Sequence, residues 1–147
     1  MSQVVLQAEN LTKIYRSAEK DLVVLDSISF TVHQGESISI IGPSGSGKTT
    51  LVNMITGIDR PSAGTVTVDG HRIDEMSEEE LAIWRGERVG VVFQFFQLLP
   101  TLTALENAML PLDFSRRVPR RERAGVAMRN LELVGLSEKA ESLPSEM

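Results

Sequence analysis

The sequence contains no cysteine, and this absence removes two classes of site. Without thiols the chain can form neither a disulfide framework nor a thiolate metal centre, which fits a cytosolic protein. The first residues do not combine a basic segment with a long apolar one, so we expect no signal peptide. Apolar runs such as Val91-Val92-Phe93 are far too short to cross a bilayer. Any link to a membrane is therefore expected to come from a partner chain.

The chain also lacks an excess of positive charge. It carries 15 Lys and Arg against 20 Asp and Glu, for a net charge of −5. No global basic field is present to gather nucleic acid or anionic lipid, and we expect no nucleic-acid partner. The length of 147 residues and the 41% hydrophobic content are enough for one domain with a core.

Short alternating apolar runs predict strands in the first part of the chain, and helical spacing dominates the last part. Asp69-Gly70 lies between two such runs and predicts a tight hairpin turn. The elements expected, by residue number, are strands at 4–8, 22–25, 27–32, 37–41 and 88–93, a hairpin over 65–73, and helices over 48–58, 77–84, 103–111 and 119–134.

Start and stop signals support the last three helices. Ser77 and Thr103 are each followed three residues later by glutamate, which is the spacing of a capping box. Pro111 is expected to close the helix that Thr103 opens. Gly135 is expected to cap the final long helix at its carboxyl end.

A complete G-x-x-x-x-G-K-[ST] pattern connects the strand at 37–41 to the helix that follows it. Its glycines let backbone N–H groups turn inward toward phosphate oxygens, and the helix start adds its positive dipole. Lys48 would supply a mobile charge for the β- and γ-phosphates, and the Thr49 hydroxyl would bind Mg²⁺. A glycine-rich surface turn is the plain alternative, which the strand–loop–helix context disfavours. The predicted Mg-ATP contacts are Gly42, Pro43, Ser44, Gly45, Ser46, Gly47, Lys48, Thr49 and Thr50.

With these motifs the sequence resembles an ATP-binding subunit of the ABC transporter family from Val4 to Met147. Residues 42–51 match the phosphate loop of that family closely. Val92-Phe93-Gln94 followed by 98–103 and Glu106-Asn107 resembles its glutamine loop. The finer pattern of 94–100 with Glu106-Asn107 is similar to the lipoprotein-release and macrolide-export branch.

The resemblance implies an α/β fold, namely a P-loop NTPase of the ABC ATPase type. It would combine an N-terminal antiparallel β subdomain with part of a RecA-like core and part of a helical subdomain. The boundaries implied are 1–36 and 60–75 for the antiparallel β subdomain, 37–59 and 86–94 for the P-loop core, and 95–147 for the glutamine loop and the start of the helical subdomain.

The resemblance also implies roles for two residues outside the phosphate loop. Tyr15, the only tyrosine, lies where the family places an aromatic ring that stacks on adenine; packing at a strand edge is the alternative. Gln94 lies where the family senses Mg²⁺ and the attacking water, although a polar residue there can simply mark the surface. Thr49 and Gln94 are therefore the expected metal contacts.

Three parts of a complete ATPase of this family do not occur among these residues. They are the signature motif, the apolar strand ending in Asp-Glu, and the switch histidine. Residues 143–147 resemble the segment that leads into the signature, so the chain looks truncated just before it. We therefore expect the 147-residue chain by itself to bind ATP and Mg²⁺ without hydrolysing ATP.

The resemblance implies membrane-spanning transporter subunits and a second ATPase domain as partners, the latter in a homodimer. The chain would then lie in the cytoplasm, on the inner face of the cell membrane. Residues 94–107 would form the surface that couples it to the membrane subunits, with Phe96 and Leu99 as the main contacts. For Phe95 and Leu98, a contact with the membrane subunits and local core packing are equally expected. The alternatives are a non-catalytic ATP-binding regulatory module, a truncated inactive fragment, and a soluble P-loop enzyme such as a small-molecule kinase.

Overall fold

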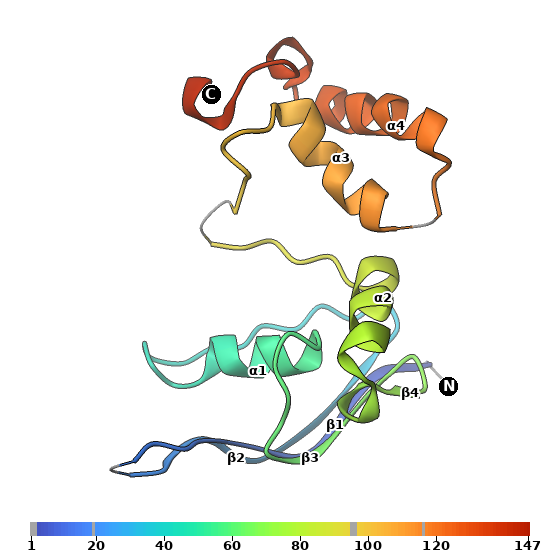
Figure 1. The fold of residues 1–147 in the computed structure, drawn as a ribbon. Helices are drawn as coiled ribbons and strands as arrows, with labels where there is room; N and C mark the ends of the chain where they lie inside the picture. Colours follow the sequence, from blue (N-terminus) through green and yellow to red (C-terminus); the bar gives the residue numbers. More distant parts are fainter. Residues whose placement is uncertain (1–2, 19, 95–96, 116) are drawn as a thin grey trace. The chain divides into compact units, whose positions relative to one another are not determined.

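The computed structural model describes residues 3–18, 20–94, 97–115 and 117–147. The chain divides into two compact units, residues 1–81 and 82–147. The elements of secondary structure (Figure 1) are, in chain order, β1 Val4–Tyr15, β2 Leu22–His33, α1 Lys48–Ile55, β3 Ala63–Val68, β4 His71–Arg72, the 3₁₀ helix η1 Ile73–Glu75, α2 Glu78–Arg88, α3 Ala104–Phe114, α4 Arg120–Leu133, and the 3₁₀ helices η2 Ser137–Lys139 and η3 Pro144–Glu146.

The first unit contains an antiparallel sheet with the strand order β2-β1-β3-β4. β2 is one strand of 12 residues, so the prediction of separate strands at 22–25 and 27–32 is wrong. Ser27 has a left-handed φ of 52°, and its N–H is held by the Thr12 hydroxyl at 3.1 Å. A β-bulge near Ser27 therefore accommodates a shift in the register of β1 with β2, and the two strands remain paired on both sides of it.

The hairpin between β3 and β4 is confirmed. Asp69 and Gly70 connect the two strands with φ angles of 47° and 77°. Two successive positive φ angles are typical of a type I′ turn, whose twist matches that of the flanking strands.

Helix α1 lies against the sheet and contacts β1, β2 and β3 (Figure 1). Leu51 and Met54 are its buried residues, and Leu11 and Val66 of the sheet are fully buried as well. The helix ends at Ile55, three residues earlier than the sequence predicts. The Ile58 N–H bonds to the Asn53 carbonyl at 2.8 Å, and this turn closes the helix.

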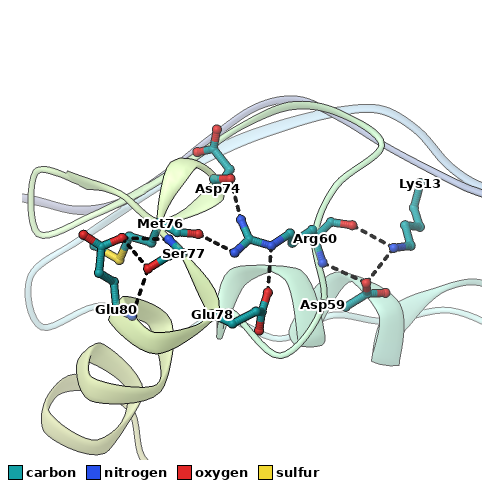
Figure 2. A network of polar contacts seen from close by, with 8 residues as sticks. All are labelled: Lys13, Asp59, Arg60, Asp74, Met76, Ser77, Glu78 and Glu80. Atoms are coloured by element: carbon teal, nitrogen blue, oxygen red, sulfur yellow. Dashed lines mark hydrogen bonds and ion pairs between the residues drawn. The ribbon is translucent and has the colours of Figure 1, made fainter.

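Arg60 connects the segment after α1 to the start of α2, within the first unit (Figure 2). Its guanidinium donates to the Asp74 carbonyl at 2.9 Å and to the Met76 carbonyl, and it pairs with the Glu78 carboxylate at 3.0 Å.

Ser77, just before α2, forms the predicted capping box. Its N–H donates to the Glu80 carboxylate at 2.7 Å, and its hydroxyl accepts from the Glu80 N–H at 3.3 Å. This start of α2 is therefore confirmed.

The predicted strands at 37–41 and 88–93 are wrong as written. Helix α2 continues to Arg88, and no ladder in the described part of the chain includes 37–41 or 89–93. Ile41 is 92% exposed and Val92 is 99% exposed. An apolar run becomes a strand only when a neighbouring strand supplies its hydrogen bonds, and neither run has such a neighbour in the described ranges.

In the second unit, α3 packs against α4 (Figure 1). The Thr103 capping box is confirmed, with the Glu106 N–H bonded to the Thr103 hydroxyl at 3.2 Å. Pro111, however, lies inside α3 and does not close it. A proline inside a helix removes one N–H and crowds the carbonyl four residues earlier, but the Pro111 carbonyl still accepts from the Ser115 N–H at 3.0 Å, and the helix continues to Phe114.

The carboxyl end of α4 and the segment after it complete this unit. Gly135 has a φ of 73°, and its N–H bonds to the Glu132 carbonyl at 3.0 Å, which confirms the predicted cap. The carbonyls of Ala140 and Ser142 accept from the first N–H groups of α3, each at 2.9 Å. Across the described ranges, the structure contains no helix with the length and apolar character needed to cross a membrane.

Candidate nucleotide-binding site

The phosphate loop runs into the first turn of α1 through two glycines in left-handed conformations. Gly45 has a φ of 77° and Gly47 a φ of 86°. Gly47 is the residue before the helix, its carbonyl accepts from the Leu51 N–H at 2.8 Å, and no side chain caps this end of α1. The first N–H groups of a helix have no partner within it, and they carry the positive end of its dipole. This helix start therefore offers donors to an anion.

The close approach of the loop to the sheet explains the glycine at 47. A Cβ built on Gly47 would lie 2.9 Å from Leu25 Cδ2 and 3.0 Å from the Val24 carbonyl oxygen. A Cβ on Gly42 would lie 2.7 Å from the hydroxyl oxygen of Ser46, inside the loop itself. The Ser46 hydroxyl can rotate away from a side chain at 42, whereas the Val24 backbone near Gly47 cannot, so the contact with the sheet excludes a side chain at 47.

The Lys48 ammonium folds back over its own loop. It donates to the Gly42 carbonyl at 2.9 Å and to the Pro43 carbonyl at 2.7 Å. The Pro43 carbonyl also accepts from the Ser46 N–H at 3.3 Å. A cation with mobile contacts to neutral carbonyls can exchange them for stronger contacts to phosphate oxygens.

Tyr15 is the last residue of β1, and its side chain is 44% exposed. Its hydroxyl donates to the Asp59 carboxylate at 3.1 Å, and the Lys13 ammonium lies over its ring, 5.0 Å from the centroid. Lys13 pairs across the sheet with Leu25, the residue against which Gly47 packs. Tyr15 is thus two residues along β1 from the strand pair that faces Gly47, and its contact with a base stays a prediction.

Asp59, whose carboxylate accepts from the Tyr15 hydroxyl, also bonds to Lys13 and Arg60 (Figure 2). Its carboxylate accepts from the Lys13 ammonium at 2.6 Å and from the Arg60 N–H at 2.7 Å. Burial acts to raise the pKa of Asp59, but the hydrogen bonds from Lys13, Arg60 and Tyr15 outweigh it, and the pKa is lowered. The carboxylate is therefore ionised at neutral pH. Sequence reasoning missed Lys13 and Asp59 because they are 46 residues apart, and no local motif connects them.

Gln94 is an exposed residue in a bend of the second unit, whereas the phosphate loop belongs to the first unit. Its contact with a metal stays a prediction. Phe96, predicted as a main contact of the coupling surface, and Phe95, predicted for either that surface or local packing, lie outside the described residues. The prediction favoured Leu99 over Leu98 as a coupling contact. The two residues are almost equally exposed, at 47% and 45%, so their exposure does not support that distinction.

The Glu106-Asn107 pair of the glutamine-loop motif has a structural role. Glu106 completes the capping box of α3. The Asn107 side chain accepts from the Leu99 N–H at 2.8 Å and donates to the carbonyls of Leu99, Leu102 and Thr103 at 3.0–3.1 Å. One amide group therefore holds the loop before α3 in shape, which the sequence pattern alone did not reveal.

No group of three or more histidine, cysteine or acidic side chains that could hold a metal occurs in the described ranges. The Thr49 hydroxyl is exposed in the first turn of α1, and its contact with Mg²⁺ stays a prediction.

Comparison with known proteins supports the same family. Residues 25–147 match the family model for the ABC transporter. The chain is 44% identical over 142 residues to the uncharacterized ABC transporter ATP-binding protein YknY of Bacillus subtilis, covering 97% of this chain and 61% of that protein. It is 41% identical over 146 residues to the lipoprotein-releasing system ATP-binding protein LolD of Chromohalobacter salexigens, covering 99% of this chain and 61% of LolD.

Among solved structures, a dimeric structure of the ATP-binding cassette MJ0796 in a post-hydrolysis state, bound to ADP and Pi, matches with a TM-score of 0.89 at 36% identity. The match covers 97% of this chain and 62% of that one. The chain thus spans about six-tenths of the length of the relatives that it matches. The fold and the family expected from the motifs are both confirmed. The chain belongs to the ABC transporter family, among whose ATP-binding proteins its relatives are named.

Proposed function

We propose that this chain binds Mg-ATP through residues 42–50 and serves as the ATP-binding part of an ABC transporter. The observation that carries the proposal is the geometry of the phosphate loop. A helix start without a side-chain cap follows two left-handed glycines, and the Lys48 ammonium lies across the loop at two of its carbonyls. The free N–H groups of the helix start are hydrogen-bond donors for phosphate oxygens, and the Lys48 ammonium is the positive charge that a triphosphate requires.

Each predicted residue has a role in this site. Backbone N–H groups of 45–49 hold the β- and γ-phosphates, and Lys48 moves from the loop carbonyls to the phosphate oxygens. Thr49 and Gln94 would contact Mg²⁺, which would neutralise phosphate charge when bound. The exposed ring of Tyr15 would carry the adenine. Binding and orientation are the work of these residues.

We extend the proposal to partners through the family. In ABC transporters the ATP-binding part pairs with a second ATPase domain and works beneath membrane-spanning subunits on the cytoplasmic face. The dimeric structure of MJ0796 supports the pairing by similarity. Residues 94–107 would form the coupling surface, where Leu99 is a half-exposed apolar residue on a loop braced by Asn107. Such a residue on a rigid loop suits a protein contact.

The test is the affinity for ATP of Lys48→Ala, measured by equilibrium binding of a fluorescent ATP analogue. A hydrogen bond to a charged group is typically worth about 1.5–3 kcal/mol, so we expect the affinity to fall about tenfold to hundredfold. Lys139→Ala is the matched control, because it removes an exposed lysine of the second unit. Unchanged affinity in Lys48→Ala, or an equal loss in both variants, would contradict the proposal.

A further inference from the structure

The ring of Tyr15 is held at two points by groups that belong to one cluster. The Lys13 ammonium lies over the ring at 5.0 Å from its centroid, and the Asp59 carboxylate accepts from the hydroxyl at 3.1 Å. A cation over an aromatic ring is attracted by the negative face of the ring. One face of Tyr15 is thus occupied, while 44% of the residue remains exposed.

Lys13 owes its place to Asp59. Its side chain is only 11% exposed, and its ammonium bonds to the Asp59 carboxylate at 2.6 Å and to the Arg60 carbonyl at 2.7 Å. A largely buried ammonium is costly unless a carboxylate pairs with it. Asp59 therefore fixes both the hydroxyl of Tyr15 and the cation over its ring.

Asp59 is in turn fixed by the chain around it. Its carboxylate accepts from the Arg60 N–H at 2.7 Å, and its own N–H bonds to the Asn53 carbonyl of α1 at 3.0 Å (Figure 2 shows the first of these). Helix α1 therefore contacts both parts of the site. Its first turn forms the end of the phosphate loop, and Asn53, near its last turn, holds Asp59. The eight residues of α1 span roughly 12 Å at 1.5 Å per residue.

We propose that Asp59 is a positioning residue for the base of the nucleotide. It holds the Tyr15 ring by its hydroxyl and keeps Lys13 over one face, which leaves the other face for adenine. This inference rests on the proposed function, because it concerns the same site. A ring fixed in advance loses less side-chain freedom when the base binds, so the cluster raises affinity for the base and leaves phosphate binding unchanged.

The test compares ATP with inorganic tripolyphosphate, which has no base, in the protein expressed from its complete gene. Both are measured by displacement of a fluorescent ATP analogue. We expect Asp59→Asn to weaken ATP about threefold to tenfold and to leave tripolyphosphate unchanged, as a partial loss of the stacking contact requires. In a Tyr15→Ala background, Asp59→Asn should produce no further loss for ATP, because the ring through which it acts is gone.

Asp21→Asn is the matched control, since it neutralises an exposed aspartate of the same unit and should change neither affinity. If Asp59→Asn fails to fold, Lys13→Met replaces it: this variant removes the cation while Asp59 keeps the bonds from Arg60 and Tyr15, and the same selective loss is expected. Equal losses for ATP and tripolyphosphate, or no loss for ATP, would overturn the inference. If instead Lys48→Ala and Tyr15→Ala both leave ATP binding intact, the proposed function itself fails.

Discussion

Replacing Gly47 by alanine is expected to be far more damaging than the same change at Gly45. Both glycines have a left-handed φ, 86° and 77° respectively, so both substitutions place a Cβ in a strained backbone conformation. That strain costs roughly 1–2 kcal/mol for a residue other than glycine. The two sites differ in their surroundings. A Cβ on Gly45 meets nothing within 4 Å, whereas one on Gly47 meets the sheet.

The crowding at Gly47 has little room to relax. The nearest atoms to its Cβ would be Leu25 Cδ2 at 2.9 Å, the Val24 carbonyl oxygen at 3.0 Å and Val24 Cγ1 at 3.1 Å. Leu25 is buried, and the carbonyl belongs to the backbone of β2. Overpacking of this kind typically costs about 1–3 kcal/mol. Added to the backbone strain, Gly47→Ala should cost about 2–5 kcal/mol and Gly45→Ala about 1–2 kcal/mol.

Denaturant unfolding of the two variants and the unsubstituted protein measures these costs, and equilibrium binding of a fluorescent ATP analogue reports the effect on the loop. Gly47→Ala should lose both stability and affinity, because the start of α1 must move away from β2. Gly45→Ala should keep most of its stability. Equal free energies of unfolding for the two variants would show that the sheet does not crowd position 47.

Three further predictions concern the site and its partners. Tyr15→Ala should weaken ATP by about 1–3 kcal/mol while Tyr15→Phe and Tyr15→Trp remain close to the unsubstituted protein; equal affinities for the alanine and phenylalanine variants would make Tyr15 a packing residue. A polypeptide of residues 1–147 alone should release no phosphate from ATP above background, and turnover that disappears in Lys48→Ala would contradict this. Serine at both Phe96 and Leu99 should uncouple transport from hydrolysis in the protein with its membrane subunits while ATP binding persists; intact transport and co-purification would place the coupling surface elsewhere.

Local chemistry was sufficient to predict the elements whose signals lie within a few residues. The Asp69-Gly70 turn requires two positive φ angles, and the pairs Ser77 with Glu80 and Thr103 with Glu106 bond within their own first turns. The phosphate loop is similar, because its glycines, lysine and threonine act within one short segment. None of these features depends on distant parts of the chain, so the sequence pattern is enough.

Features that depend on tertiary partners were not predictable in the same way. The runs at 37–41 and 89–93 have the composition of strands, yet a strand also needs a neighbour to bond, and a sequence pattern does not identify one. Pro111 was assigned to a helix end from its missing N–H, although the packing of α3 against α4 can sustain the helix through it. The cluster of Lys13 and Asp59 arises only when β1 meets the end of α1.

A crystal structure of the protein with Mg²⁺ and a non-hydrolysable ATP analogue would show whether the loop binds the phosphates as proposed. We expect phosphate oxygens within hydrogen-bond distance of the N–H groups of 45–49, and a Lys48 ammonium that has moved from the carbonyls of Gly42 and Pro43 to the phosphates. We also expect the adenine against the face of Tyr15 that Lys13 does not cover. A nucleotide bound elsewhere, or a Lys48 that keeps both carbonyl contacts beside the bound triphosphate, would contradict this proposal.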